Sequence, residues 1–130
     1  TDFSNLAFQV KMTILDGNDG GIYIRRNDAA HADYEFAVGS DGSYTLSYRT
    51  SSNQIKTLQS GSATSFHKGY NQSNVLAMVA RGTNIDLYVN QQHFITVQNA
   101  SLTHGAVGML AAEQNMSTQV SYTDAAVWQF

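Results

Sequence analysis

Aromatic, cationic and anionic side chains alternate with apolar ones in three short segments between residues 22 and 49. Arg25 and Arg49 can each donate a pair of parallel hydrogen bonds to hydroxyls or to a carboxylate. Glu35 can accept hydrogen bonds, and the ring of Tyr23 can stack against the apolar face of a ligand. If Tyr23, Arg25, Glu35 and Arg49 share one surface, they form a candidate carbohydrate-binding site.

The segments that carry these residues are predicted to be β-strands, because their apolar residues occur at every second position. Residues 40–42, Ser-Asp-Gly, predict a tight hairpin with Gly42 in the left-handed conformation. This arrangement puts one set of polar side chains on the outward face: Tyr23, Arg25, Asp33, Glu35, Ser47 and Arg49. An ordinary solvated surface with Asp33–Arg49 and Glu35–Arg25 ion pairs explains the same pattern, since polar outward faces are usual in antiparallel sheets.

Two further aromatic residues are candidates for a binding surface. Tyr70 lies in a long polar connection, residues 60–73, and loops of this length in a compact domain are either functional or mobile. Trp128 lies near the end of the chain, and we expect it to belong to the core.

The middle of the chain, residues 74–97, predicts a three-stranded antiparallel meander. Its first turn, Gly82-Thr83, pairs six apolar residues on one side: Ala80 with Ile85, Met78 with Leu87, and Leu76 with Val89. The second turn, Asn90-Gln91, is expected to bring Phe94 opposite Leu87. Residues 6–14 also alternate strictly, and no segment has helical periodicity, so the sequence predicts an all-β protein, an antiparallel two-sheet β-sandwich.

The composition limits the classes of partner. The 130 residues predict a single domain, 1–130. The first residue is Thr rather than Met, so we expect this domain to have been excised from a longer chain. The net charge of −3 and the scattered basic residues argue against nucleic-acid binding. No apolar run approaches the ~18 residues that cross a membrane, so no membrane insertion is expected. The absence of cysteine excludes disulfides and thiolate metal sites.

Several stretches resemble one known group of proteins. Residues 81–90, Arg-Gly-Thr-Asn-Ile-Asp-Leu-Tyr-Val-Asn, followed by Gly-Ala-Val-Gly-Met at 105–109, look like the late strands of concanavalin A-like lectin/glucanase domains. Residues 20–25 and 41–46 resemble earlier strands of that group, and residues 122–124 resemble a part near its closing strand. The nearest subgroup is the bacterial laminin-G-like, or 3-keto-disaccharide hydrolase-like, domains. The resemblance implies a concanavalin A-like jelly roll, and the fold hosts binding modules, hydrolases and spacers alike.

Catalytic and metal-binding patterns are weak. Glycoside hydrolysis uses two carboxylates across the scissile bond, and the glucanases of this fold place theirs at alternate positions of one strand. The two glutamates, Glu35 and Glu113, lie far apart in sequence, so we expect no paired-carboxylate motif. We therefore assign no catalytic residues and expect that the protein is not an enzyme. No histidine has a second ligand at metal spacing, so no metal residues are assigned and no cofactor is expected. The turn at Asp16, Asn18 and Asp19 would suit structural calcium, although these residues are also ordinary turn formers.

Three functions are therefore weighed. The first is a non-catalytic carbohydrate-binding module, with a glycan as partner, in a larger bacterial extracytoplasmic or secreted protein. The second is a structural, protein-interaction or sensor domain, and the third is a glycosidase-like hydrolase. The chain also starts after the point where the resembling domains have an opening strand. Residues 119–130 carry no Lys or Pro against edge pairing, so we expect their open edge to be covered, either by a second copy in an edge-strand homodimer or by a rearranged N-terminus.

Overall fold

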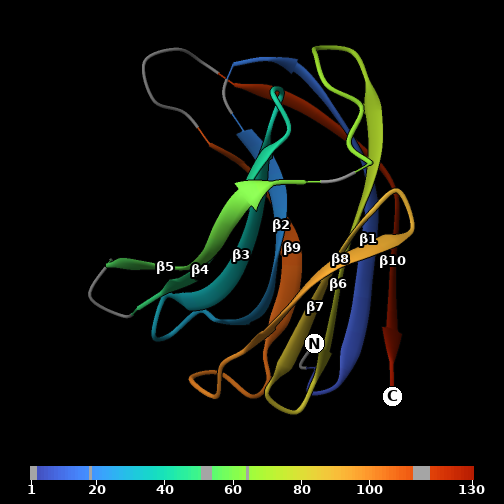
Figure 1. Ribbon diagram of the computed structural model, residues 1–130. Helices are drawn as coiled ribbons and strands as arrows, with labels where there is room; N and C mark the ends of the chain where they lie inside the picture. The colour runs from blue at the N-terminus through green and yellow to red at the C-terminus, as the bar shows by residue number, and fades with distance from the viewer. Residues whose placement is uncertain (1–2, 18, 51–53, 64, 113–117) are drawn as a thin grey trace.

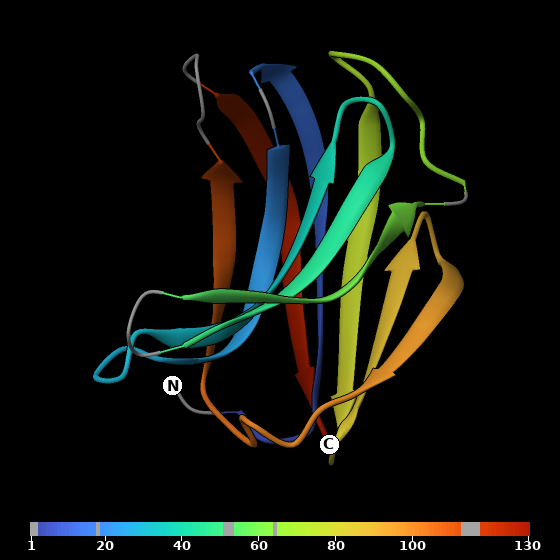
Figure 2. The ribbon, with the colours of Figure 1, turned by 60° about the vertical axis from the view of Figure 1, so that its left-hand side comes forward.

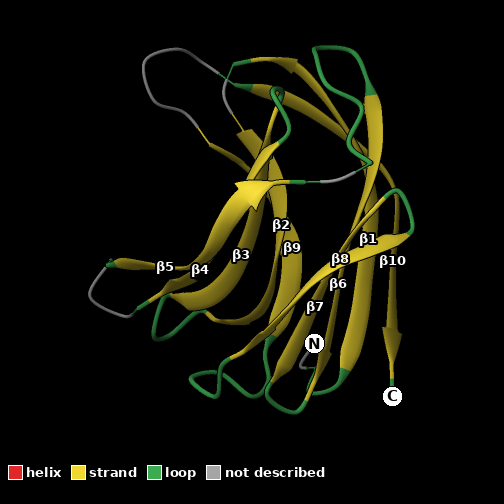
Figure 3. Ribbon diagram, in the orientation of Figure 1, coloured by secondary structure: helices red, strands yellow, loops and turns green. Residues whose placement is uncertain are grey.

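The structure, a computed structural model, describes residues 3–17, 19–50, 54–63, 65–112 and 118–130. Each regular element in these ranges is a strand, as Figure 3 shows. The strands are β1 (Leu6–Asp16), β2 (Asp19–Asn27), β3 (Ala32–Gly39), β4 (Ser43–Arg49), β5 (Ile55–Ser62), β6 (Ser73–Arg81), β7 (Asn84–Val89), β8 (Gln92–Gln98), β9 (Ala106–Ala112) and β10 (Gln119–Gln129). Within the described ranges there is no helix of the length and hydropathy that a membrane span requires.

The strands form two five-stranded antiparallel sheets that face each other (Figures 1 and 2). The β1 sheet has the order β10-β1-β6-β7-β8, and the β3 sheet has the order β5-β4-β3-β2-β9. The chain enters and leaves at the same end of the sandwich, where the amide of Phe130 donates to the carbonyl of Asn5 at 3.0 Å. The predicted all-β, two-sheet sandwich is confirmed.

The core lies between the sheets and follows from period-two alternation. Leu6, Phe8, Val10, Met12 and Ile14 of β1 are all buried, and so are the apolar residues that alternate along β6 and β7. The β3 sheet contributes the second layer: Ile22, Ile24, Tyr34, Phe36, Val38, Tyr44 and Leu46. Because side chains in a strand point alternately to opposite faces, these positions also determine which residues point outward.

The predicted hairpins have the expected register, with one exception. Met78 pairs with Leu87, and Phe36 pairs with Leu46 across a turn in which Gly42 has a φ of 85°. Phe94, however, does not face Leu87. Ile95 does, because β8 contains a β-bulge opposite the Leu87–Tyr88 step. A bulge inserts one extra residue into a strand and shifts the partners beyond it by one.

Candidate functional site

The candidate site lies on the outward face of the β3 sheet, and a bulge in β2 decides which residues reach it. The pairing of β2 shifts between Ile24 and Asn27 on the β3 side and between Tyr23 and Arg26 on the β9 side. Arg25 has a φ of 53°, in the left-handed region. A bulge here turns the next side chains to the opposite faces. Arg25 therefore points into the sandwich and Arg26 takes the outward position.

Arg25 is 1% exposed, which corrects the expectation that it shares the outward face with Tyr23. Its guanidinium donates to the carbonyl of Ser4 from Nη2 at 2.8 Å and from Nε at 3.1 Å. Its Nη1 donates to the carbonyls of Gly82 at 2.8 Å and Leu102 at 3.1 Å. Arg25 thus ties the N-terminal segment, the β6–β7 turn and the loop before β9 together, and it is not placed to contact a ligand on the outer face.

Arg26 occupies the place expected for Arg25. Its Nε and Nη2 both lie 3.0 Å from Oδ2 of Asp33 on β3, and its Cζ lies 4.0 Å from the centre of the Tyr23 ring. Arg26 is half-buried, with its guanidinium held by an ion pair on one side and an aromatic ring on the other. Such a fixed guanidinium loses little freedom when it binds a further acceptor.

Arg49 is held in a similar way by the neighbouring carboxylate. Its Nε donates to Oε2 of Glu35 at 2.9 Å and its Nη2 contacts Oε1 at 3.4 Å, so the contact is bidentate. The expected ion pairs of Asp33 with Arg49 and of Glu35 with Arg25 are therefore wrong. Asp33 does stand opposite Arg49 in the register, but Arg49 reaches diagonally to Glu35 and leaves Asp33 to Arg26.

The surroundings of Asp33 favour its protonated form. Asp33 is fully buried, and its Oδ1 has no hydrogen-bond donor among the described residues when the group is ionised. Burial, and after it the hydrogen bond and charge of Glu35, raise the pKa of Asp33 to about 7 against the opposing effect of Arg26. A proton on Asp33 gives Oδ1 a partner, because the resulting hydroxyl donates to Glu35.

Glu35 remains the ionised member of the pair. Burial acts to raise the pKa of Glu35, but hydrogen bonds from Arg49 and Asp33 outweigh it and lower the pKa below its usual value. We call Arg26, Asp33, Glu35 and Arg49 the arginine–carboxylate cluster. It presents two fixed guanidinium groups and one carboxylate at the surface, with one buried carboxyl beneath them.

Tyr23 belongs to the site but is not an open platform. A side chain at Gly108, the residue paired with it on β9, would meet the Tyr23 hydroxyl at 2.1 Å and Cζ at 2.3 Å. The ring therefore lies across the bare backbone of Gly108, and Arg26 covers it. A ligand meets the guanidinium and the ring edge rather than a free aromatic face.

Tyr70 is not brought to this cluster. It is 44% exposed, and its hydroxyl donates to the carbonyl of Gly17 at 2.9 Å. Gly17 precedes the end of β2 that pairs with Gly39, whereas the cluster lies at the other end, where Asp33 pairs with Arg49. The structure separates Tyr70 from the rest of the predicted site.

The turn considered for calcium lies near Tyr70. A polar hollow of about 200 Å³ is lined by Gly17, Asp19, Gly39, Ser40, Asp41 and Ser43. Burial and the charge of Asp41 raise the pKa of Asp19. Nowhere in the described part of the chain do three His, Cys, Asp or Glu side chains converge as metal ligands, and Asn18 lies outside that part.

Sequence reasoning missed two residues of the cluster, and a signal existed for each. Asp33 stands two positions before Glu35, so two acids do share one face of a strand, contrary to the expectation of no paired carboxylates. Arg26 follows Arg25 directly, so either arginine of the doublet could take the outward position once a bulge intervenes. Glu113, the other glutamate considered, is outside the described residues.

The chain matches no family model and no curated protein sequence, but solved structures resemble it over almost its whole length. The carbohydrate-binding module CBM66 from Bacillus subtilis superposes with a TM-score of 0.84 at 14% identity, covering 98% of this chain and 76% of that one. Sheep galectin-11 gives 0.70 at 11% identity, with 98% and 95% covered. The β-glucanase of Bacillus licheniformis gives 0.70 at 10% identity, with 100% and 68% covered. The chain therefore has the concanavalin A-like lectin/glucanase fold.

Proposed function

We propose that this chain is a non-catalytic carbohydrate-binding module of a larger extracytoplasmic bacterial protein, and that it binds a neutral glycan at the arginine–carboxylate cluster. One observation carries the proposal. Arg26 on β2 and Arg49 on β4 flank β3 on an outward sheet face, each held by a carboxyl group of β3 and each with about a third of its side chain exposed. Planar groups fixed in this way can donate to neighbouring hydroxyls of one sugar ring while Glu35 accepts from a third.

The existing contacts of the cluster suit a neutral ligand. Arg26 already contacts the Asp33 carboxyl and Arg49 already contacts the Glu35 carboxylate, so no anion is needed to hold either guanidinium in place. Neutral hydroxyls can bond to the remaining donor and acceptor positions without replacing either ion pair. The likeness to a carbohydrate-binding module and a galectin supports the same class of ligand.

The carboxyl pair does not suit glycoside hydrolysis. In hydrolases the two carboxyl groups flank the scissile bond at ~5–10 Å from each other. Asp33 and Glu35 are joined by a hydrogen bond instead, and Asp33 has no exposed surface through which to reach a substrate. Asp33 is thus a positioning residue that holds Arg26 and Glu35.

A glycan array followed by calorimetry on the strongest ligand tests the proposal. Arg49→Ala should weaken binding by roughly 10–100-fold, the equivalent of one or two charge-assisted hydrogen bonds. Arg81→Ala removes an exposed arginine of the other sheet and should leave affinity unchanged. Gly108→Ala keeps every polar group but displaces the Tyr23 ring, so it should also weaken binding.

Three results would contradict the proposal. Undiminished binding by the Arg49→Ala protein moves the site elsewhere. Binding to no glycan on the array favours the interaction-domain alternative. Release of sugar from a chromogenic glycoside, lost in Glu35→Gln, would make the chain an enzyme.

A further inference from the structure

Trp128 is not a core residue, which corrects the expectation from sequence. It is 50% exposed and pairs with Ala7 across the β1–β10 ladder. A bulge in β10 explains its orientation. Thr123 pairs with Lys11 but Ala126 pairs with Gln9, and Asp124 between them has a φ of 56°. The extra residue turns Trp128 from the core side, where Val120 and Tyr122 point, to the outward face of the β1 sheet.

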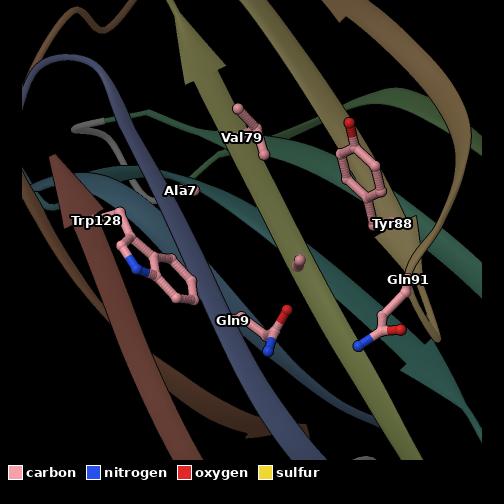
Figure 4. Close-up of a pocket in the computed structure, with 7 residues that line it drawn as sticks. Ala7, Gln9, Val79, Tyr88, Gln91 and Trp128 are labelled. Carbon is pink, nitrogen blue, oxygen red and sulfur yellow. The ribbon is translucent and has the colours of Figure 1, made fainter. Parts of the chain in front are cut away.

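The outward face of the β1 sheet has a hollow beside Trp128, with a volume of about 250 Å³. Its floor consists of the small side chains of Ala7, Ala77 and Val79 on the adjacent strands β1 and β6. Trp128 on β10 and Tyr88 on β7 border it on opposite sides, and Gln9 and Gln91 extend their amides along one end (Figure 4). Small residues in the middle of an outward face flanked by aromatic ones leave room that a regular polar face would fill.

We propose that this hollow is a second ligand site, independent of the arginine–carboxylate cluster, which binds a single neutral sugar ring. The lining contains no charged residue, so an ionic ligand gains nothing there. A sugar ring has apolar C–H faces and a polar rim, and the hollow has the matching pattern of an indole and aliphatic floor with amide and phenol groups around it. The side chains of Gln9 and Gln91 make no hydrogen bond to another described residue that would have to be broken.

The size of the hollow favours one ring over a longer ligand or a protein. Small-molecule sites usually measure ~300–1,000 Å³, so a hollow of about 250 Å³ corresponds to a ligand at the small end of that range. A stable protein interface needs about 800 Å² on each partner. The apolar area here is small, because charged residues lie next to it on the same face: Asp86 pairs with Val79 and Lys11 pairs with Val75.

The single tryptophan of the chain makes this site directly observable. Methyl glycosides of glucose, galactose, mannose and fructose are titrated into the full chain while tryptophan fluorescence is recorded. We expect a saturable change in emission with at least one of them, at millimolar concentration. Ala77→Gln fills the floor without touching Trp128 and should abolish the change. Thr13→Gln makes the same kind of replacement on the outward face of β1 away from the hollow and should retain it, with circular dichroism confirming that both variants fold.

The cluster variant separates the two sites. Arg49→Ala should leave the fluorescence response intact, even if it removes glycan binding on the β3 sheet. Absence of any response in the wild-type protein overturns the second site, as does a response that survives Ala77→Gln or disappears in Arg49→Ala.

Discussion

Arg25 and Arg26 are neighbours with the same side chain, yet their surroundings give them opposite roles. Arg25 donates only to backbone carbonyls of three separate segments, Ser4, Gly82 and Leu102. Arg26 contacts a carboxyl and an aromatic ring at the surface. The first arrangement satisfies buried acceptors and contributes to stability, and the second leaves donors available for a ligand.

Arg25→Met should strongly destabilise the fold. The change leaves three partly buried carbonyls without their donor, and each lost hydrogen bond of a charged group costs ~1.5–3 kcal/mol. We expect the free energy of unfolding in urea to fall by at least ~3 kcal/mol. Arg81→Met, which removes an exposed arginine over the Phe130 ring, should cost less than ~1 kcal/mol. Equal effects of the two changes would contradict the structural role of Arg25.

Asp33 should make stability depend on pH. The folded pKa of about 7 lies above the ordinary value of 3.8, so the folded chain retains a proton that the unfolded chain releases between these values. The contribution of Asp33 is fully present below the ordinary pKa and is lost as pH rises through about 7. The free energy of unfolding should therefore fall as the pH rises from 5 to 8. The decrease should be roughly the contribution of one carboxyl group whose pKa is raised by folding.

Asp33→Asn tests this directly, because an amide can donate to Glu35 and accept from Arg26 at any pH. In that variant the decrease between pH 5 and pH 8 should be smaller than in the wild type, measured by urea unfolding at each pH. Asp28→Asn, in an exposed turn, should retain the wild-type decrease. If the Asp33→Asn protein follows the wild-type curve, the pH dependence does not come from Asp33.

At the scale of elements, period-two alternation was sufficient for the strands and insufficient for the site. It predicted the buried faces of β1, β6 and β7 and the partners across the Gly42 and Gly82 turns. It failed at Arg25, Phe94 and Trp128, and at each of them a bulge shifts the register. Arg25 and Asp124 have positive φ without being glycine, so no glycine in the sequence marks these two bulges. A single extra residue reverses the faces beyond it, which is why outward residues were harder to predict than buried ones.

The β7–β8 turn should be easy to stabilise. Asn90 has a φ of 52° and Gln91 a φ of 69°, as a two-residue turn with both residues left-handed requires. Asparagine tolerates that conformation and glutamine does not, at a cost of ~1 kcal/mol or more. Gln91→Gly should raise the free energy of unfolding by ~1 kcal/mol in urea. Thr83→Gly, at the corresponding position of the β6–β7 turn where φ is not positive, should give no increase, and equal gains at both sites would contradict this explanation.

At the scale of the molecule, the sandwich presents two unlike outward faces. The β3 sheet carries the charged cluster, and the β1 sheet carries the uncharged hollow. Because the two sheets pack against each other, their outward faces, and any ligands bound there, lie on opposite sides of the sandwich (Figure 2). The fold and its core could be predicted from sequence, since burial follows apolar alternation. The side chains that occupy the two outward faces could not be predicted, because they depend on bulges and on side-chain pairs that reach diagonally between strands.

The last prediction concerns the edge of the β1 sheet. β10 lies at that edge, and within the described residues β1 is its only neighbouring strand, with the N-terminal segment bridged to Gly105 instead. Its sequence bears a single charge, Asp124, so little opposes pairing with another strand. We expect two copies to pair through β10 in a twofold dimer, seen by light scattering as a molecular mass that rises with protein concentration. Ser121→Lys with Thr123→Lys should restore the monomer by placing like charges against each other across the twofold axis, whereas Gln92→Lys on β8, at the other edge, should not. A wild-type chain that remains monomeric at all concentrations would rule the dimer out.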